Sequence, residues 1–221
     1  MQPVRSLPVL ALAVSAAGLG APAAAGAATI TLDRTCYVEQ TAITVTGSGF
    51  PAGADVTLSG DGAYGTAVAD AAGGFVTVIQ APINPSIGAR NADIIESTLQ
   101  AQYFAGAVQS TTASYRVTNF AYTVSDSTGN PRKKRTFYLS GFPTDSTVYA
   151  HYRIGGKTRG TVRFGKAQGP CGQITARQAL LPSAVPLRYG TWKIQWDNNR
   201  SYDAKALPRL TTNLSVYRTY R

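Results

Sequence analysis

The sequence has few of the side chains that carry out chemistry. It contains one His, two Cys and 11 Asp and Glu residues among 221, and charged residues make up 14% of the chain, against about 25% in an average soluble domain. A zinc site needs three or four His, Cys or carboxylate ligands at suitable spacing, and one His with two distant Cys does not supply them. We expect no metal, no cofactor and no enzyme activity.

The sequence also lacks sustained helical periodicity and a long apolar run. Its apolar run, residues 9–19, is too short for a membrane span, which needs about 20 residues. Arg5 precedes this run and small residues follow it, which is the pattern of a secretory signal peptide. We expect a signal peptide over residues 1–27, with cleavage after Ala27 and with Ala25 or Ala28 as alternatives. The mature protein should be secreted or associated with the cell envelope, with no membrane span.

The sequence is rich in turn formers and in Tyr, with 22 Gly, 12 Pro and 12 Tyr. From residue 29 onward, short β-type runs alternate with Gly, Pro, Asn or Asp, and each half of the chain contains about seven of them. Seven short strands with turns every 8 to 12 residues or so are typical of an immunoglobulin-like sandwich. The fold class is therefore predicted as all-β, with two tandem immunoglobulin-like β-sandwich domains over residues 28–118 and 119–221. The expected strands cover residues 29–32, 42–46, 55–59, 66–69, 75–80, 94–104, 109–118, 120–125, 136–140, 147–154, 160–164, 173–178, 190–197 and 210–218.

The two halves repeat each other at nearly constant spacing, which indicates duplicated architecture. The tripeptide Gly-Phe-Pro occurs at residues 49–51 and again at 141–143, and residues 98–103 (TLQAQY) parallel residues 191–196 (TWKIQW). Alternate residues of a strand share one face. The core should therefore contain Leu99, Ala101, Tyr103, Trp192, Ile194 and Trp196.

The first repeat resembles a motif of secreted bacterial immunoglobulin-like modules. Residues 46–56 (TGSGFPAGADV) followed by 69–75 (ADAAGGF) are similar to the pattern G-x-G-F-x-P-G-x-x-V…D-x-x-G-x-F. The resemblance implies an extracellular spacer, adhesion unit or carbohydrate- or wall-associated domain. The same turns also resemble the neocarzinostatin-like apoproteins, which carry a small apolar ligand. In the motif, we expect Gly47 and Gly49 to adopt positive φ and Phe50 to close one end of the sandwich.

The two cysteines, Cys36 and Cys171, lie in different halves. In an oxidising compartment their usual fate is a disulfide, which would join the two domains. Two free buried thiols or an intermolecular bridge are the alternatives.

The net charge of +10 conceals two domains of opposite sign. Residues 29–118 contain three cations and seven anions, a net charge of −4, whereas residues 119–221 contain 17 cations and four anions, a net charge of +13. An excess of this size predicts a surface that binds an anionic polymer such as a phosphate-rich wall polymer, an acidic glycan or extracellular DNA. The alternative is that the charges only keep the protein soluble and that the acidic domain docks against the basic one. No helix-turn-helix, zinc-finger or RNP-like motif is present, so sequence-specific nucleic-acid binding is not expected.

The residues predicted to form this polyanion surface lie on a basic run and a neighbouring hairpin: Arg132, Lys133, Lys134, Arg135, His151, Arg153, Lys157, Arg159, Arg163 and Lys166. The function predicted is that of a non-catalytic structural or binding protein. A small-molecule carrier, expected to show a deep pocket lined by aromatic rings, is one alternative. An unrecognised hydrolase, expected to join His151 to a carboxylate and a Ser in a cleft, is the other.

Overall fold

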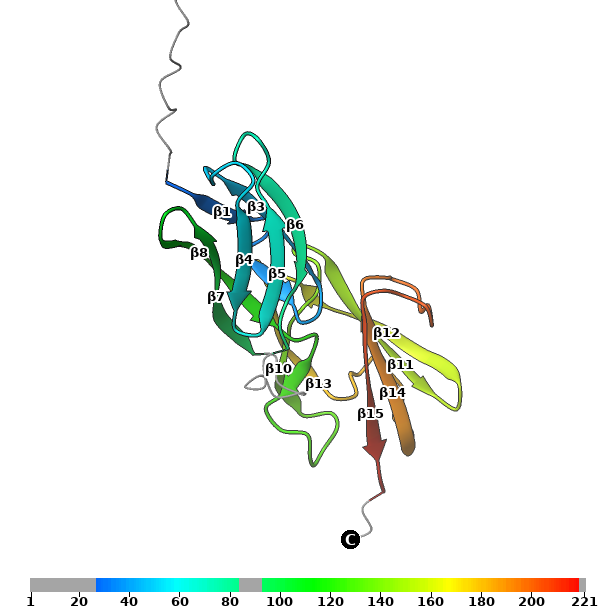
Figure 1. Ribbon diagram of the computed structural model, residues 1–221. Helices are drawn as coiled ribbons and strands as arrows, with labels where there is room; N and C mark the ends of the chain where they lie inside the picture. The colour runs from blue at the N-terminus through cyan, green and yellow to red at the C-terminus, as the bar shows by residue number, and fades with distance from the viewer. Residues whose placement is uncertain (1–26, 84–92, 219–221) are drawn as a thin grey trace, which may run out of the picture.

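The protein is described by a computed structural model that covers residues 27–83 and 93–218. Of the expected signal peptide, only Ala27 lies within these ranges. The described residues form β-strands connected by turns and loops, as the fold-class prediction required (Figure 1). None of them belongs to a helix that could cross a membrane.

The first domain consists of two sheets packed face to face. The smaller sheet has the order β1-β3-β6, with β1 (Thr29–Leu32), β3 (Ala42–Ser48) and β6 (Phe75–Gln80). The larger has the order β2-β8-β7-β4-β5, with β2 (Cys36–Val38), β8 (Val108–Thr118), β7 (Ile94–Phe104), β4 (Asp55–Gly60) and β5 (Ala63–Val68). All pairs are antiparallel except β2 with β8, which is parallel.

The second domain repeats this strand order. Its smaller sheet is β13-β10-β9, with β9 (Tyr122–Val124), β10 (Lys134–Leu139) and β13 (Ile174–Ala179). Its larger sheet is β12-β11-β14-β15, with β11 (Thr147–Ile154), β12 (Lys157–Lys166), β14 (Gly190–Asp197) and β15 (Arg209–Val216). Both domains are immunoglobulin-like sandwiches, and the second has no counterpart of β2 among its described strands.

Each domain has its own hydrophobic core. Leu99 and Ala101 are completely buried in the first, and Trp192 and Trp196 are at most 1% exposed in the second, as the alternation of these segments predicted. Both cores draw on both sheets of their sandwich, which is what holds the sheets together.

The Gly-Phe-Pro corners close one end of each sandwich. Phe50 is 3% exposed and packs against Phe75 and Tyr103. Gly49 has the expected positive φ of 77°. The expectation of positive φ at Gly47 is wrong. Glycine is required there because a Cβ would lie 2.1 Å from the Phe75 ring.

Two connections join the domains. The first is the chain itself, since only three residues separate β8 from β9, and two of these, Asn119 and Ala121, are buried. The second is the disulfide between Cys36 and Cys171, whose Cα atoms are 5.2 Å apart. The predicted pairing is therefore confirmed, and both sulfur-bearing residues are buried.

Packing and hydrogen bonds of Tyr37 fix strand β2 beside the disulfide. Tyr37 is 1% exposed and packs edge-on against Tyr115 of β8. Its hydroxyl donates a hydrogen bond to Asp33 and accepts one from the Arg34 N–H. Burial and the Asp33 carboxylate raise the pKa of Tyr37 to about 12, so this hydroxyl stays protonated and keeps donating.

Replacing both cysteines with alanine should destabilise the protein. The disulfide spans 135 residues, and the chain-entropy model gives up to about 5 kcal/mol for a loop of this length. In urea unfolding, the Cys36→Ala/Cys171→Ala variant should unfold at a clearly lower denaturant concentration than the wild type. A reductant should lower the unfolding midpoint of the wild type and leave that of the variant unchanged. Equal midpoints for both proteins would show that the cross-link has no part in stability.

Candidate functional site

The predicted polyanion residues fall into three groups in the structure. Arg132 and Lys133 lie in the loop between β9 and β10, and Lys134 and Arg135 are the first two residues of β10. His151 and Arg153 lie on β11, and the remaining hairpin residues lie on β12. Six of the ten predicted residues therefore belong to the four-stranded sheet.

Arg132 and Arg135 hold the loop that precedes β10. Arg132 donates to the carbonyl groups of Leu181 and Val185 at 2.8 and 2.9 Å. Arg135 is 3% exposed and donates to the carbonyl groups of Asn130 and Lys133. Both guanidinium groups are engaged inside the domain, so we leave them out of the proposed surface. Lys133 and Lys134 are exposed, but they lie at or directly before the start of β10 in the three-stranded sheet, so they too are left out of the proposed surface.

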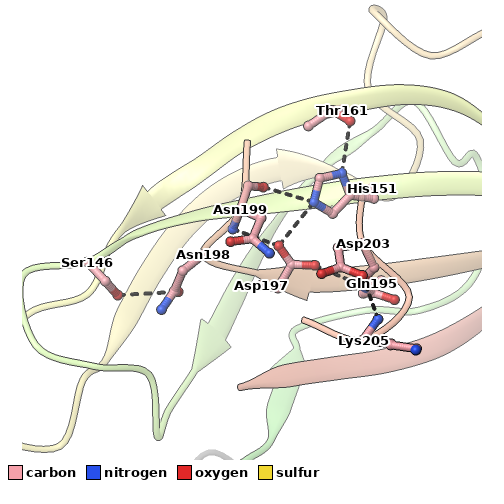
Figure 2. Close-up of polar contacts among 9 residues, drawn as sticks. All are labelled: Ser146, His151, Thr161, Gln195, Asp197, Asn198, Asn199, Asp203 and Lys205. Atoms are coloured by element: carbon pink, nitrogen blue, oxygen red, sulfur yellow. Dashed lines mark hydrogen bonds and ion pairs between the residues drawn. The ribbon is translucent and has the colours of Figure 1, made fainter. Parts of the chain in front are cut away.

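His151 is completely buried, because the segment 198–208 folds over the outer face of the sheet. Its Nε2 lies 3.2 Å from Asp197 Oδ1 and 3.1 Å from the carbonyl oxygen of Asn199, and its Nδ1 lies 2.9 Å from Thr161 Oγ1 (Figure 2). Since Nε2 faces two acceptors, we assign it the proton, which leaves Nδ1 to accept from the Thr161 hydroxyl. His151 therefore also leaves the proposed surface.

The Asp197 carboxylate is saturated by its neighbours. Besides His151, Gln195 Nε2 donates to its Oδ2 at 2.6 Å and the Asn199 N–H donates to its Oδ1 at 2.8 Å. Gln195 also donates to the carbonyl oxygen of Asp203 (Figure 2). These bonds tie the segment 198–208 to β11 and β14.

A hydroxyl, an imidazole and a carboxylate in series are also the arrangement of acyl-transfer triads. The hydrolase alternative expected a Ser, but Ser146 bonds to Asn198 (Figure 2), and the hydroxyl beside His151 is that of Thr161. The imidazole ring and the carboxylate are both 0% exposed, so a substrate has no access to Nε2. We interpret the cluster as a structural support for the outer face.

Arg153 is held beside this cluster by the same segment. Its guanidinium carbon lies 4.1 Å from the centre of the Tyr202 ring, and Nη1 donates to the Tyr202 hydroxyl at 2.6 Å. Such a cation–π contact fixes a guanidinium without neutralising it. Arg153 thus keeps its full charge in a defined position.

Three further cations lie at the same end of the sheet as Arg153, near the β11–β12 turn. Lys193 of β14 lies directly opposite Arg153 in the ladder, so both side chains are on the outer face. Lys157 begins β12 opposite Ile154, and Arg159 follows Thr158, the partner of Arg153, at the shift of register between Tyr152 and Arg153. We call Arg153, Lys157, Arg159 and Lys193 the basic end.

Lys193 was missed by sequence reasoning, although the signal was present. Trp192 and Ile194 were assigned to the core, and alternation places the residue between them on the outer face.

At the other end of the sheet, the two predicted cations have different surroundings. Arg163 lies opposite Tyr149, and Lys166 is paired with Asp145 at 2.8 Å.

The carboxylates of the second domain are all engaged elsewhere. Asp126 lies 3.8 Å from Arg135, Asp145 pairs with Lys166, and Asp197 pairs with His151. Asp203 accepts from the Lys205 N–H. Among the described residues, none of these carboxylates forms a salt bridge with the basic end. In the same part of the chain, no three His, Cys, Asp or Glu side chains gather as a metal site would require.

A second feature lies where the two domains meet. A hollow of about 590 Å³ is bordered by the disulfide and by Tyr37, Val38, Phe120, Phe142 and Pro143. Its size is within the usual range of small-molecule sites, about 300 to 1,000 Å³, and its lining is mainly apolar. Residues of both domains and the cross-link between them are needed to form it.

Replacing His151 with alanine should strongly destabilise the second domain. The change removes one of the hydrogen-bond donors to the buried Asp197 carboxylate, and leaving a buried charged group short of a donor costs about 3 kcal/mol or more. Thr161→Val removes only the bond to Nδ1 and should cost about 1 kcal/mol. Chemical denaturation of both variants would check this order. Similar stabilities would contradict the role assigned to the cluster.

No protein-family model and no curated protein sequence matches the chain. Among solved structures, the chain is similar to a tetra-tandem repeat in the extending region of a large adhesion protein, with 13% identity, a TM-score of 0.30 and coverage of 84% of this chain and 47% of the other. It is also similar to a Ca2+-stabilized adhesin with which an Antarctic bacterium binds ice (16% identity, TM-score 0.32, coverage 87% and 48%). A third similarity is to the fibronectin(III)-like modules of Clostridium thermocellum CbhA (11% identity, TM-score 0.25, coverage 85% and 96%). The chain spans about half the length of the two adhesin chains, and TM-scores this low assign no function to it.

Proposed function

We propose that the protein is a non-catalytic, exported binding module whose second domain holds an anionic polymer at the basic end. The observation that carries the proposal is the direct opposition of Arg153 and Lys193 on neighbouring strands. Like charges placed directly opposite are destabilising, and an anionic ligand removes that repulsion.

The surroundings of this pair support the proposal. Tyr202 holds the Arg153 guanidinium in place, and the Nε of Arg159 is buried without a hydrogen-bond partner. Lys157 and Lys193 are exposed. One Arg held by Tyr202, a second Arg with an unpartnered Nε and two exposed Lys side chains suit a ligand with repeated phosphate, sulfate or carboxylate groups.

Export is supported by two features of the chain. The first 27 residues have the pattern of a signal peptide, and the disulfide joins the two domains. Disulfides persist in oxidising compartments such as the cell exterior. A phosphate-rich wall polymer, an acidic glycan and extracellular DNA are the polyanions that such a protein would meet.

Binding to a polyanion should weaken steeply with salt and depend on the basic end. With a short DNA duplex as the probe, the logarithm of the binding constant falls linearly with the logarithm of the salt concentration. Each lost phosphate contact makes this slope less steep by about 0.9. In fluorescence anisotropy titrations, the Lys157→Gln/Lys193→Gln variant should therefore show a slope less steep by about 2.

The matched control is Lys134→Gln/Arg177→Gln, which removes two exposed cations from the three-stranded sheet. It should leave the slope nearly unchanged. An equal loss in both variants would show that binding depends on net charge alone, and the basic end would not be a site. The same titrations with polyphosphate and with heparin would compare the binding of a phosphate polymer with that of a sulfated glycan.

The hollow between the domains supports a second function, that of a carrier for a small apolar molecule. Aromatic rings of Tyr37, Phe120 and Phe142 border it, which is the feature expected of a carrier. Because the lining of the hollow is mainly apolar, it favours a ligand with a cyclic or aromatic hydrocarbon skeleton over a sugar.

Filling the hollow should weaken binding of an apolar dye. Thr144 lies exposed at its border, so Thr144→Trp should occupy it without disturbing the core. Titration with anilinonaphthalene sulfonate should show binding to the wild type and at least about tenfold weaker binding to this variant. Thr112→Trp, on the exposed face of β8, is the control. Equal dye binding by all three proteins would remove the hollow as a carrier site.

A further inference from the structure

The hairpin formed by β7 and β8 ends in an exposed apolar turn. Residues 104–108 (FAGAV) contain no polar side chain and are all exposed. Phe104 and Val108 are 69% and 71% exposed, and they lie directly opposite each other in the ladder. Their side chains therefore lie on the same side of the hairpin. We call residues 104–108 the apolar tip.

The apolar tip extends beyond the rest of the first sandwich. The ladder between β4 and β7 ends at Thr57 and Gln102, so β7 continues past its neighbour, and the turn projects from the side of the first domain (Figure 1). A Cβ at Gly106 would meet no atom within 4 Å, so this part of the turn stands clear of the other described residues. Contiguous exposed apolar side chains mark interaction sites.

The described chain has one such tip and one hollow between its domains. In the second domain, β14 and β15 correspond to β7 and β8, but the segment 198–208 joins them and folds back over the outer face of the sheet. The hollow between the domains needs the disulfide and residues of both sandwiches, so it too is formed once. Each copy of the protein therefore presents one apolar tip and one hollow.

The apolar tip and this hollow lie at opposite ends of strand β8. Val108 begins the strand at the tip, and Thr118, its last residue, borders the hollow. The distance between these two residues along an extended strand is about 33 Å, at about 3.3 Å per residue. The tip of one molecule therefore cannot enter the hollow of the same molecule.

The hollow has the size and the lining that the tip requires. An apolar cavity of about 150 Å³ is enough to bind benzene, so the hollow, with about 590 Å³, accommodates the Phe104 ring and its neighbours in the tip. The rings of Tyr37, Phe120 and Phe142 border the hollow. Aromatic rings pair favourably edge to face, so these rings suit a phenyl group.

The distribution of charge favours contact between unlike ends of two copies. The tip belongs to the first domain, with a net charge of −4, and the hollow is bordered on one side by the second domain, with a net charge of +13. A contact between two tips would instead bring two acidic domains together. Residues 94–115 contain no Lys or Arg, so the hairpin lacks the cations that attract proteins to anionic lipid.

We infer that the protein assembles head to tail, with the apolar tip of one copy inserted into the hollow between the domains of the next. Two different surfaces meet in this contact, so it is heterologous, and a heterologous contact that does not close into a ring builds an open chain. The separation of tip and hollow along β8 places successive copies one after another. The small-molecule function uses the same hollow, so one molecule cannot serve both uses at once.

Association should depend on the apolar tip. In sedimentation velocity at physiological ionic strength, which screens the repulsion between copies, the mean sedimentation coefficient of the wild type should rise with concentration. Phe104→Ser/Val108→Ser removes both large side chains of the tip without a change in charge and should weaken association at least about tenfold. The matched control is Tyr64→Ser/Val68→Ser on β5. These residues are 69% and 63% exposed and do not border the hollow, so this variant should associate as the wild type does.

A mixture of two variants tests the head-to-tail geometry. Thr144→Trp fills the hollow and keeps the tip, whereas Phe104→Ser/Val108→Ser keeps the hollow and loses the tip. Each variant alone should remain monomeric. An equimolar mixture should form dimers and nothing larger, because each pair retains one intact tip and one intact hollow. Dimers in the mixture would also show that both variants are folded.

Four results would overturn the inference. A wild type that is monomeric at about 1 mM has no such contact, and its tip-dependent sedimentation with phosphatidylcholine vesicles would identify a membrane as the partner of the tip. Association of the Thr144→Trp variant at the wild-type level would indicate contact between two tips. A mixture that remains monomeric would show that tip and hollow do not bind each other. An equal effect of the tip and control changes would indicate non-specific association of exposed apolar residues.

Discussion

The disulfide between Cys36 and Cys171 is the constraint on which the arrangement of the two domains depends. The chain already joins the domains through three residues between β8 and β9, and one short connection permits rotation. A second connection near the first removes that freedom. The hollow between the domains exists because both connections hold Tyr37 of one sandwich near Phe142 of the other. The cross-link thus creates a surface that neither domain has alone.

The same cross-link explains the asymmetry between the sandwiches. Cys36 lies on β2, so the strand that completes the larger sheet of the first domain is also the strand that reaches the second. In the second domain, the corresponding length of chain forms a loop pinned by Arg132 and Arg135. The larger sheet of the first domain therefore has one short strand more than that of the second, although the remaining strand order is the same in both.

Most of the strands could be predicted from the sequence because their alternation is strong. The segments 147–154 and 190–197 were predicted at the observed bounds, and the cores they form contain the expected Trp192 and Trp196. Strand β2 was missed because three residues are too few to show a period, and its register is fixed by a parallel partner about 80 residues away in the chain. The burial of His151 was missed for a similar reason. Its place on β11 could be predicted from the alternation, but its cover, the segment 198–208, has no regular pattern and is held by single hydrogen bonds to Asp197 and Gln195.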